Sequence, residues 1–470
     1  MVKKLLSYVK EYKTAAILTP LFMLLEVAME MVIPQFMASI IDDGIGMGDM
    51  GHILRVGGLM LLTALIGLFA GVMGGKYGAI ASAGFAKNLR SAMFEKIQTY
   101  SFKNIDRFSS SSLITRLTTD VTNLQNAFQM ILRVGMRSPA SLIVALVMAI
   151  SISPKLSLVY VGALVFLIIM MIILLPITRR VFTEVFEKYD ELNNSVQENV
   201  SAIRVVKAYV REKYETEKFH KATANIYRMF VKAEKIMVVA MPVMMGTVYV
   251  TILLISWLGA KDVVGGELTV GKLTQLMTYC MNILMSLMML AMIFVMITMS
   301  VASGERIVEV LSEEPDIKNP ESPVMEVSDG SIDFEKVYFG YHETAEDFVL
   351  SDIDLHIRSG ETIGIIGGTG SAKTSLVNLI SRLYDVNEGV VKVGGRDVRE
   401  YDVETLRDQV SVVLQKNVLF SGTIYENLRW GDKNASDEEC KRACRLACAD
   451  EFIEKLPDGY DTYIEQGGTN

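Results

Sequence analysis

The chain has 470 residues, of which 51% are hydrophobic and 21% charged, and its formal net charge is −8. A collagen-like chain, a disordered chain and a disulfide framework are excluded, because apolar residues are abundant and there are only four cysteines. The negative balance and the scattered basic residues predict no nucleic-acid partner. The length predicts two or three domains.

The first three hundred residues contain apolar stretches long enough to cross a bilayer, which takes ~18 residues or more. Most of these stretches lack a polar face, unlike the helices of a soluble core. Backbone groups within hydrocarbon must pair internally, so each stretch is expected to be a helix. The sequence therefore predicts a membrane α-helical domain of six spans within residues 1–312. The spans are expected at residues 15–41, 53–75, 131–152, 156–177, 236–259 and 273–299.

The charges of the loops predict the orientation of these spans. Lysines precede the first span, acidic residues follow it, and lysines and arginines follow the second span. Because cytoplasmic loops carry the excess of Lys and Arg, the N-terminus, the two long connections and the C-terminal region are expected in the cytoplasm. Both connections have a helical pattern, so the helices are expected to continue beyond the bilayer. The protein is expected to be a multi-pass protein of the plasma membrane.

A proline-containing stretch, residues 313–329, predicts a linker between this domain and a C-terminal region over residues 330–470. The pattern changes there to short strands and helices, and strands are expected at residues 331–337, 348–357 and 362–366. The sequence thus predicts a second domain of the α/β class.

A glycine-rich loop follows the third of these expected strands, and a helical pattern over residues 375–384 follows the loop. This order is that of a phosphate-binding loop, in which backbone N–H groups and the positive end of a helix hold phosphates. Lys373 is expected to reach the β and γ phosphates of ATP, and Thr374 to bind Mg²⁺ through its hydroxyl. The nucleotide-binding residues are expected to be Gly368, Thr369, Gly370, Ser371, Ala372, Lys373, Thr374 and Ser375.

Ala372 departs from the usual loop, which has glycine directly before the lysine. Its methyl group could crowd the loop or the nucleotide. A glycine-rich turn that binds nothing is the alternative interpretation.

Three further groups of residues have both a functional and a structural interpretation. Glu26 and Glu30 lie on one face of the first span, where they either favour cationic substrates or have a structural role. A methionine stripe along the sixth span either lines a cavity for varied hydrophobic compounds or packs against helices or lipid. Cys440, Cys444 and Cys448 are expected to pack in a short amphipathic helix, because no nearby histidine completes a metal site.

The chain resembles the ATP-binding cassette exporters over nearly its whole length. The resemblance is carried by residues 337–341, 410–415 and 419–428, and by residues 461–468 with Glu465, which look like the segment before the family's signature motif. It implies that Tyr341 stacks on adenine and that Gln415 contacts Mg²⁺ or the attacking water. In the membrane half, residues 106–120, residues 203–219 and residues 302–311 resemble the family's coupling regions and the run into the linker.

The sequence departs from the family's pattern at its end. The sequence stops at Asn470, where the signature motif is expected to begin, and neither a Walker B strand nor the switch histidine is found after Lys373. The Asp450-Glu451 pair is rejected as Walker B because it lies in a helical pattern ahead of the expected signature. The resemblance thus covers only the N-terminal part of a nucleotide-binding domain, and a C-terminally truncated cassette is expected. This chain alone is therefore expected not to be hydrolytically competent.

The resemblance implies an ATPase-coupled translocase that exports a hydrophobic or amphipathic substrate, such as a lipid or a peptide. ATP and Mg²⁺ are the implied cofactors, and membrane lipids and a second half-transporter, identical or different, are the implied partners. The alternative is a half of a heterodimer that binds ATP and does not hydrolyse it.

Overall fold

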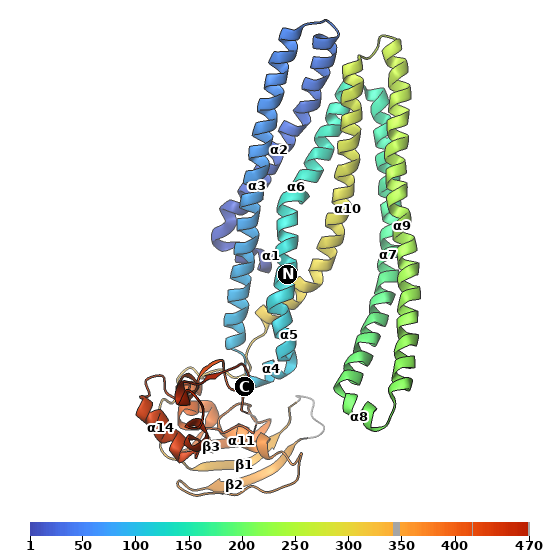
Figure 1. The fold of residues 1–470 in the computed structure, drawn as a ribbon. Helices are drawn as coiled ribbons and strands as arrows, with labels where there is room; N and C mark the ends of the chain where they lie inside the picture. Colours follow the sequence, from blue (N-terminus) through green and yellow to red (C-terminus); the bar gives the residue numbers. More distant parts are fainter. Residues whose placement is uncertain (342–347, 416, 469–470) are drawn as a thin grey trace. The chain divides into compact units, whose positions relative to one another are not determined.

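The computed structural model describes residues 1–341, 348–415 and 417–468 (Figure 1). The chain divides into two compact units. The first comprises residues 1–100 and 105–314, and the second comprises residues 101–104 and 315–470. Each unit has its own hydrophobic core.

The first unit is built from long helices, and six helical segments of the described chain are long and apolar enough to cross a membrane. This agrees with the six predicted spans. The long helices are α2 (Lys13–Ser39), α3 (Met50–Gln98), α6 (Val121–Ile152), α7 (Pro154–Ser201), α9 (Glu212–Val264) and α10 (Val270–Ser312). Shorter elements join them: α1 (Val2–Leu6), η1 (Ser7–Tyr12), η2 (Ile40–Ile45), α4 (Phe102–Phe108), α5 (Ser110–Thr115), η3 (Arg116–Asp120) and α8 (Ile203–Ala208).

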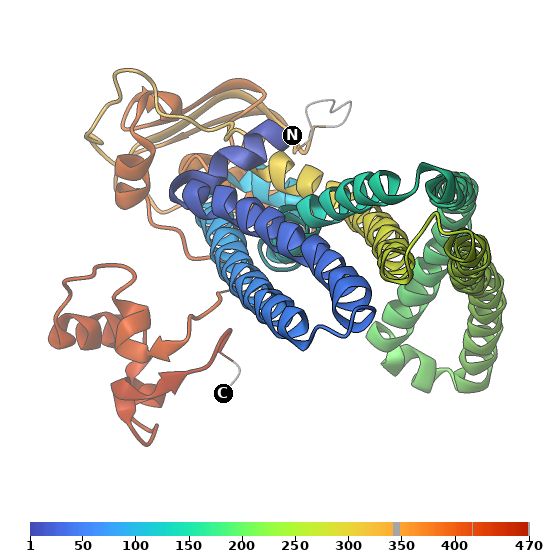
Figure 2. The same cartoon turned by 90° about the horizontal axis from the view of Figure 1, so that it is seen from above.

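Several of these helices are much longer than the bilayer requires. Helix α3 has 49 residues and α9 has 53. At ~1.5 Å per residue each exceeds about 70 Å, more than twice the ~30 Å hydrocarbon core. Helices α7 and α9 run side by side and diverge from α2, α3 and α6 towards α8 (Figures 1 and 2). The expected extension of the helices beyond the apolar stretches is therefore present.

Two clusters of buried side chains hold this unit together. One joins α2, α6, α7, α9 and α10, and its largest fully buried members are Tyr160 and Tyr279. Both hydroxyls donate to backbone carbonyls, Tyr160 to Leu276 at 2.8 Å and Tyr279 to Met31 at 2.9 Å. The other cluster joins α1, η1, α3, α4, α5 and α10.

A buried carboxylate connects η3 to the end of α10. Asp120 is 1% exposed, accepts a hydrogen bond from the Ser303 hydroxyl at 2.9 Å, and forms an ion pair with Arg306, whose Nε donates to Oδ2 at 2.7 Å. One turn earlier, Arg116 donates to the Arg306 carbonyl at 2.9 Å and pairs with Glu309 at 2.7 Å. The segment that resembles the first coupling region and the run into the linker therefore share one polar network.

The second unit contains a four-stranded antiparallel sheet in the order β2-β1-β3-β4. Its strands are β1 (Ile332–Phe339), β2 (Leu350–Ile357), β3 (Glu388–Val393) and β4 (Arg396–Asp397). Helices α11 (Lys373–Ile380) and α12 (Val403–Gln409) contribute Leu379 and Leu406 to the core beside the sheet. β1 and β2 form where the sequence predicts strands.

The C-terminal part of this unit has a separate small core. This part comprises β5 (Gly422–Thr423), α13 (Ile424–Leu428), α14 (Asp437–Leu446), α15 (Asp450–Ile453), the short helix η5 (Gly459–Asp461) and β6 (Tyr463–Ile464). The other short helix, η4 (Val398–Glu400), lies elsewhere in the unit. Cys440 and Cys444 are buried in this core, whereas Cys448 is exposed. No group of three or more His, Cys, Asp or Glu side chains in the described ranges is arranged to hold a metal ion.

The strand expected at residues 362–366 is not formed, and this prediction is wrong for the described structure. The segment has no strand pairing, and Ile366 is 99% exposed. A strand exists only when neighbouring strands exchange backbone hydrogen bonds with it. Among the described residues, no other segment forms a ladder with this one.

We expect Asp120→Asn to lower the free energy of unfolding of the first unit by about 2 kcal/mol, because it weakens hydrogen bonds to a buried charged group. Thermal unfolding of the purified protein in detergent measures this change. Arg107→Gln is the matched control. Its partner at 2.9 Å is Glu313, and the Arg107 side chain is 59% exposed, so the expected loss is below about 1 kcal/mol. Equal losses for both variants would contradict this account of the network.

Candidate nucleotide-binding site

The glycine-rich loop leads directly into α11, whose N-terminus is open. The N-cap residue is Ala372, and no side chain caps the helix. The first backbone N–H groups of a helix have no acceptor within it, so those of Lys373, Thr374 and Ser375 are available to an anion. Thr374 is exposed at this end of the helix, as a residue that binds a metal through its hydroxyl would need to be.

Lys373 is folded back onto the loop that precedes it. Its ammonium donates to the carbonyls of Gly367 at 2.9 Å and Gly368 at 2.7 Å, and to the Ser371 hydroxyl at 3.2 Å. Ser371 also closes the loop, because its backbone N–H and its hydroxyl donate to the Gly368 carbonyl at 3.3 and 2.9 Å. The lysine charge is thus held at the loop, beside the free N–H groups of α11.

Ala372 has a left-handed backbone, with φ 57° and ψ 20°. This conformation explains why glycine suits the position, since a Cβ costs about 1–2 kcal/mol there. The methyl group packs against the hydrophobic core of the sheet. The departure from the usual loop is therefore a cost in backbone energy, with some compensation from packing.

Tyr341 lies against the first turn of α11. Its hydroxyl is 2.8 Å from the Ser375 hydroxyl, and its ring contacts those of Phe339 and Tyr384 edge-on, at centroid distances of 4.9 and 5.2 Å. The structure thus brings together Tyr341 and the loop residues that the sequence assigned to one nucleotide site. The stacking of Tyr341 on adenine stays a prediction.

Residues 101–104 pack on the same aromatic group. The Phe102 ring lies 6.0 Å from the Tyr384 ring, and Ser101 hydrogen bonds to Asp316. These residues belong to the second unit, although the chain on both sides of them belongs to the first. The sequence placed the coupling region a few residues later, at residues 106–120, so the contribution of Phe102 and Tyr384 was missed.

Gln415 is exposed in the structure, and its role at the metal or the attacking water stays a prediction. The family-like string at residues 419–428 forms a compact turn, in which the Asn427 amide donates to the Phe420 carbonyl at 2.9 Å and accepts from the Phe420 N–H at 2.8 Å. Thr423 and Glu426 cap α13 reciprocally. Asp450 begins the four-residue helix α15, which agrees with its rejection as part of a Walker B strand.

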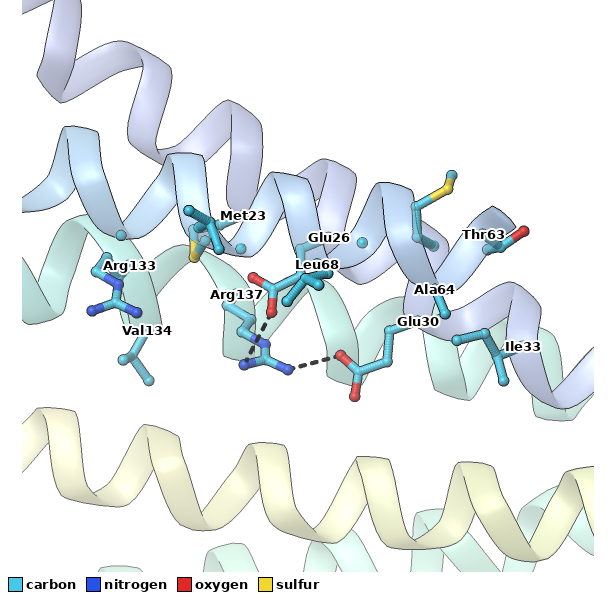
Figure 3. A pocket seen from close by; sticks show the side chains of 15 residues that line it. Met23, Glu26, Glu30, Ile33, Thr63, Ala64, Leu68, Arg133, Val134 and Arg137 are labelled. Carbon is cyan, nitrogen blue, oxygen red and sulfur yellow. Dashed lines mark hydrogen bonds and ion pairs between the residues drawn. The ribbon is translucent and has the colours of Figure 1, made fainter. Parts of the chain in front are cut away.

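The acidic residues of the first span also find their place. Glu26 and Glu30 line a pocket between α2, α3 and α6, where both pair with Arg137 (Figure 3). In the methionine stripe of α10, Met281, Met285 and Met292 are exposed in the described chain, and Met277 packs against the core. Arg137 and its neighbour Arg133 were not singled out from the sequence. Two arginines four residues apart within one apolar stretch are the signal that could have found them.

Comparisons with known proteins agree with this fold. Residues 16–288 match the family described as ABC transporter transmembrane region, and residues 350–466 match the family described as ABC transporter. The chain belongs to the ATP-binding cassette (ABC) transporters and carries a membrane region and an ATP-binding domain in one polypeptide. It is an integral membrane protein with a cytoplasmic cassette.

Several relatives within this family match most of the chain. The chain is 36% identical over 468 residues to the uncharacterized ABC transporter ATP-binding protein YfiB of Bacillus subtilis. This match covers 100% of the chain and 81% of the relative. An uncharacterized ABC transporter ATP-binding protein of Mycobacterium tuberculosis is 33% identical, with 99% and 80% covered. The ATP-dependent lipid A-core flippase of Desulfotalea psychrophila is 30% identical over 383 residues, with 81% and 66% covered.

The left-handed backbone at Ala372 predicts a strict limit on side-chain size. Ala372→Val is expected to lower the free energy of unfolding of the cassette by about 2 kcal/mol, because β-branched residues are strained at positive φ. Ala372→Gly is expected to change it by less than about 1 kcal/mol, since relief of the backbone offsets the lost methyl contact.

Thermal unfolding of the variants measures both changes. Ala443→Val, within the regular helix α14, is the matched control and is expected to cost below about 0.7 kcal/mol. If valine were tolerated equally well at both positions, the assigned conformation of Ala372 would be wrong.

Proposed function

We propose that the protein is one half of a dimeric ABC exporter, which moves a hydrophobic or amphipathic substrate across the membrane with the energy of ATP. The observation that carries this proposal is the open N-terminus of α11 beside the ammonium of Lys373, in a chain whose first unit has six membrane-crossing helices. The Desulfotalea relative is named a lipid A-core flippase, which supports an amphipathic substrate.

The residues of the loop suit the phosphates of ATP. The N–H groups of Lys373, Thr374 and Ser375 would donate to phosphate oxygens, and the Lys373 ammonium would exchange its carbonyl partners for the β and γ phosphates. Thr374 would hold Mg²⁺, which supplies charge neutralisation between these phosphates when bound. Tyr341, next to Ser375, would offer its ring face to adenine.

Hydrolysis needs further groups that position and activate water. Gln415 is proposed to contact that water or the metal. The Asp450-Glu451 pair, at the start of α15, does not follow a strand, so it is no source of the hydrolytic carboxylate. We therefore infer that residues 1–470 bind ATP, and that hydrolysis takes place in the paired transporter.

The coupling network favours mechanical transmission between nucleotide and helices. Phe102 and Tyr384 lie in the aromatic group that includes Tyr341, and Asp120 ties η3 to α10 through Arg306. A change at the nucleotide site that moved Tyr341 would therefore displace Tyr384 and, through it, residues 101–104. We therefore propose a positioning role for Phe102 and Asp120.

Equilibrium binding of a fluorescent ATP analogue to the purified chain in detergent tests the nucleotide site. Lys373→Ala is expected to weaken binding at least tenfold, which is about 1.4 kcal/mol, because it removes the only ammonium held at the loop among the described residues. Thr374→Ala is expected to abolish the part of the affinity that depends on magnesium.

Lys433→Ala, an exposed lysine of the same unit, is the control and is expected to bind as the unchanged chain does. Binding that is undetectable in the unchanged chain, or equal in Lys373→Ala and Lys433→Ala, would overturn the assignment of the site.

A further inference from the structure

The first unit contains a cavity of about 620 Å³ between α2, α3 and α6. This volume suits a ligand of drug size. The walls combine apolar side chains and glycines with Thr63 and four ionisable side chains. The apolar residues and glycines are Met23, Met29, Ile33, Ala64, Gly67, Leu68, Gly71, Val72, Gly75 and Val134. The ionisable residues are Glu26 and Glu30 from α2 and Arg133 and Arg137 from α6 (Figure 3). Their formal charges cancel.

Arg137 is partly neutralised by the two glutamates. It donates to Glu30 at 2.8 Å and lies 3.6 Å from Glu26, a separation that is an ion pair without a hydrogen bond. One arginine and two carboxylates give this end of the cavity a net negative charge. The Glu26 carboxylate has no hydrogen-bond donor within the described chain, and its side chain is 21% exposed.

Arg133, one turn before Arg137 on the same helix, lacks acceptors among the described residues, whereas Glu26 lacks a donor. Arg133 forms no ion pair with any residue that the structure describes, and its Nε is buried without a hydrogen-bond partner. Glycines make room for the side chain, since a Cβ at Gly78 would lie 3.1 Å from Arg133 Cδ. The Arg133 guanidinium therefore lies at this end of the cavity with a hydrogen-bond donor that has no acceptor among the described residues.

The Glu26 carboxylate and the Arg133 guanidinium do not pair with each other. Arg133 and Arg137 are about 6 Å apart along the axis of α6, so the positive end and the net negative end of the cavity are separated by one helical turn. Leaving charged groups without hydrogen bonds in an apolar surrounding is costly, and a ligand that supplies both missing partners recovers that cost.

We propose that this cavity binds a zwitterionic amphiphile whose headgroup carries a phosphate and an ammonium, as in an ethanolamine phospholipid. The phosphate accepts from the Arg133 guanidinium, and the ammonium donates to Glu26 beside the Glu30–Arg137 pair. The apolar lining receives the lipid's glycerol and upper chains. A purely anionic head would meet the two glutamates, and a purely cationic head would meet Arg133, so each would leave one charge unsatisfied.

As a substrate site the cavity rests on the proposed export function, whereas binding itself requires no nucleotide. Native mass spectrometry of the full chain in detergent, without ATP, measures the occupancy of added lipids of matched chain length. Phosphatidylethanolamine is expected to bind about tenfold more tightly than phosphatidylglycerol and than a cationic lipid with a trimethylammonium head. Soluble glycerophosphoethanolamine is expected to compete only weakly, because it lacks the chains that the apolar walls would bury.

The variants divide the two ends of the cavity. Glu26→Gln is expected to reduce the affinity for phosphatidylethanolamine to that for phosphatidylglycerol, and Arg133→Met to reduce it to that for the cationic lipid. Arg133→Lys keeps the charge and is expected to retain most of the preference, which separates loss of the site from loss of folding. Glu267→Gln and Arg55→Met, exposed or outside the cavity lining, are the matched controls.

Three results would overturn the proposal. These are equal affinity for all three lipids, a preference for either singly charged lipid, and a preference for phosphatidylethanolamine that survives both Glu26→Gln and Arg133→Met. Full competition by glycerophosphoethanolamine would show a site for a free soluble zwitterion and would overturn the lipid assignment. Failure of ATP binding would not alter any of these readings, so the two proposals fail separately.

Discussion

Hydrocarbon does not tolerate an unpaired backbone polar group, and this constraint shapes the whole first unit. Each of the six apolar stretches becomes a helix because only a helix satisfies its own N–H and C=O groups within one segment. Once begun, these helices need not stop at the edge of the bilayer, and α3 and α9 have total lengths of 49 and 53 residues. A rigid rod of this length can carry a displacement from the cytoplasm to the membrane interior.

The same constraint makes charge expensive within the spans, so the polar groups there identify where function is concentrated. Two of these groups, the hydroxyls of Tyr160 and Tyr279, donate hydrogen bonds to backbone carbonyls, so these side chains have a structural role. The four charges of the pocket behave differently, because Arg137 is paired whereas Arg133 has a buried nitrogen without a partner. At the other end of the unit, Asp120 is buried, and its carboxylate accepts from Ser303 and pairs with Arg306.

Local sequence was sufficient for the features whose physics is local. The spans follow from apolar length, and the glycine-rich loop before a helix follows from its glycines, Lys373 and Thr374. Ala372 was noticed as a departure, but only the backbone angle shows why glycine suits that position and that the methyl group faces the core. These are consequences of conformation, which residue identity alone does not express.

Non-local features were the ones that sequence reasoning missed or misjudged. The strand expected at residues 362–366 has a convincing apolar pattern, yet pairing depends on segments distant in the chain. Arg137 could be placed beside Glu26 and Glu30 only once α2 and α6 were packed together. Phe102 was overlooked because its partner, Tyr384, lies 282 positions further along the chain, and a single sequence contains no sign of that contact.

The central claim is that the start of α11 holds the phosphates of ATP in a membrane transporter. Amide hydrogen exchange of the purified full chain, compared with and without ATP and magnesium, tests it most directly. The account predicts selective slowing of exchange at the amides of Lys373, Thr374 and Ser375, with little change at the equally short helix α12. Unchanged exchange at these three amides at saturating nucleotide would contradict it.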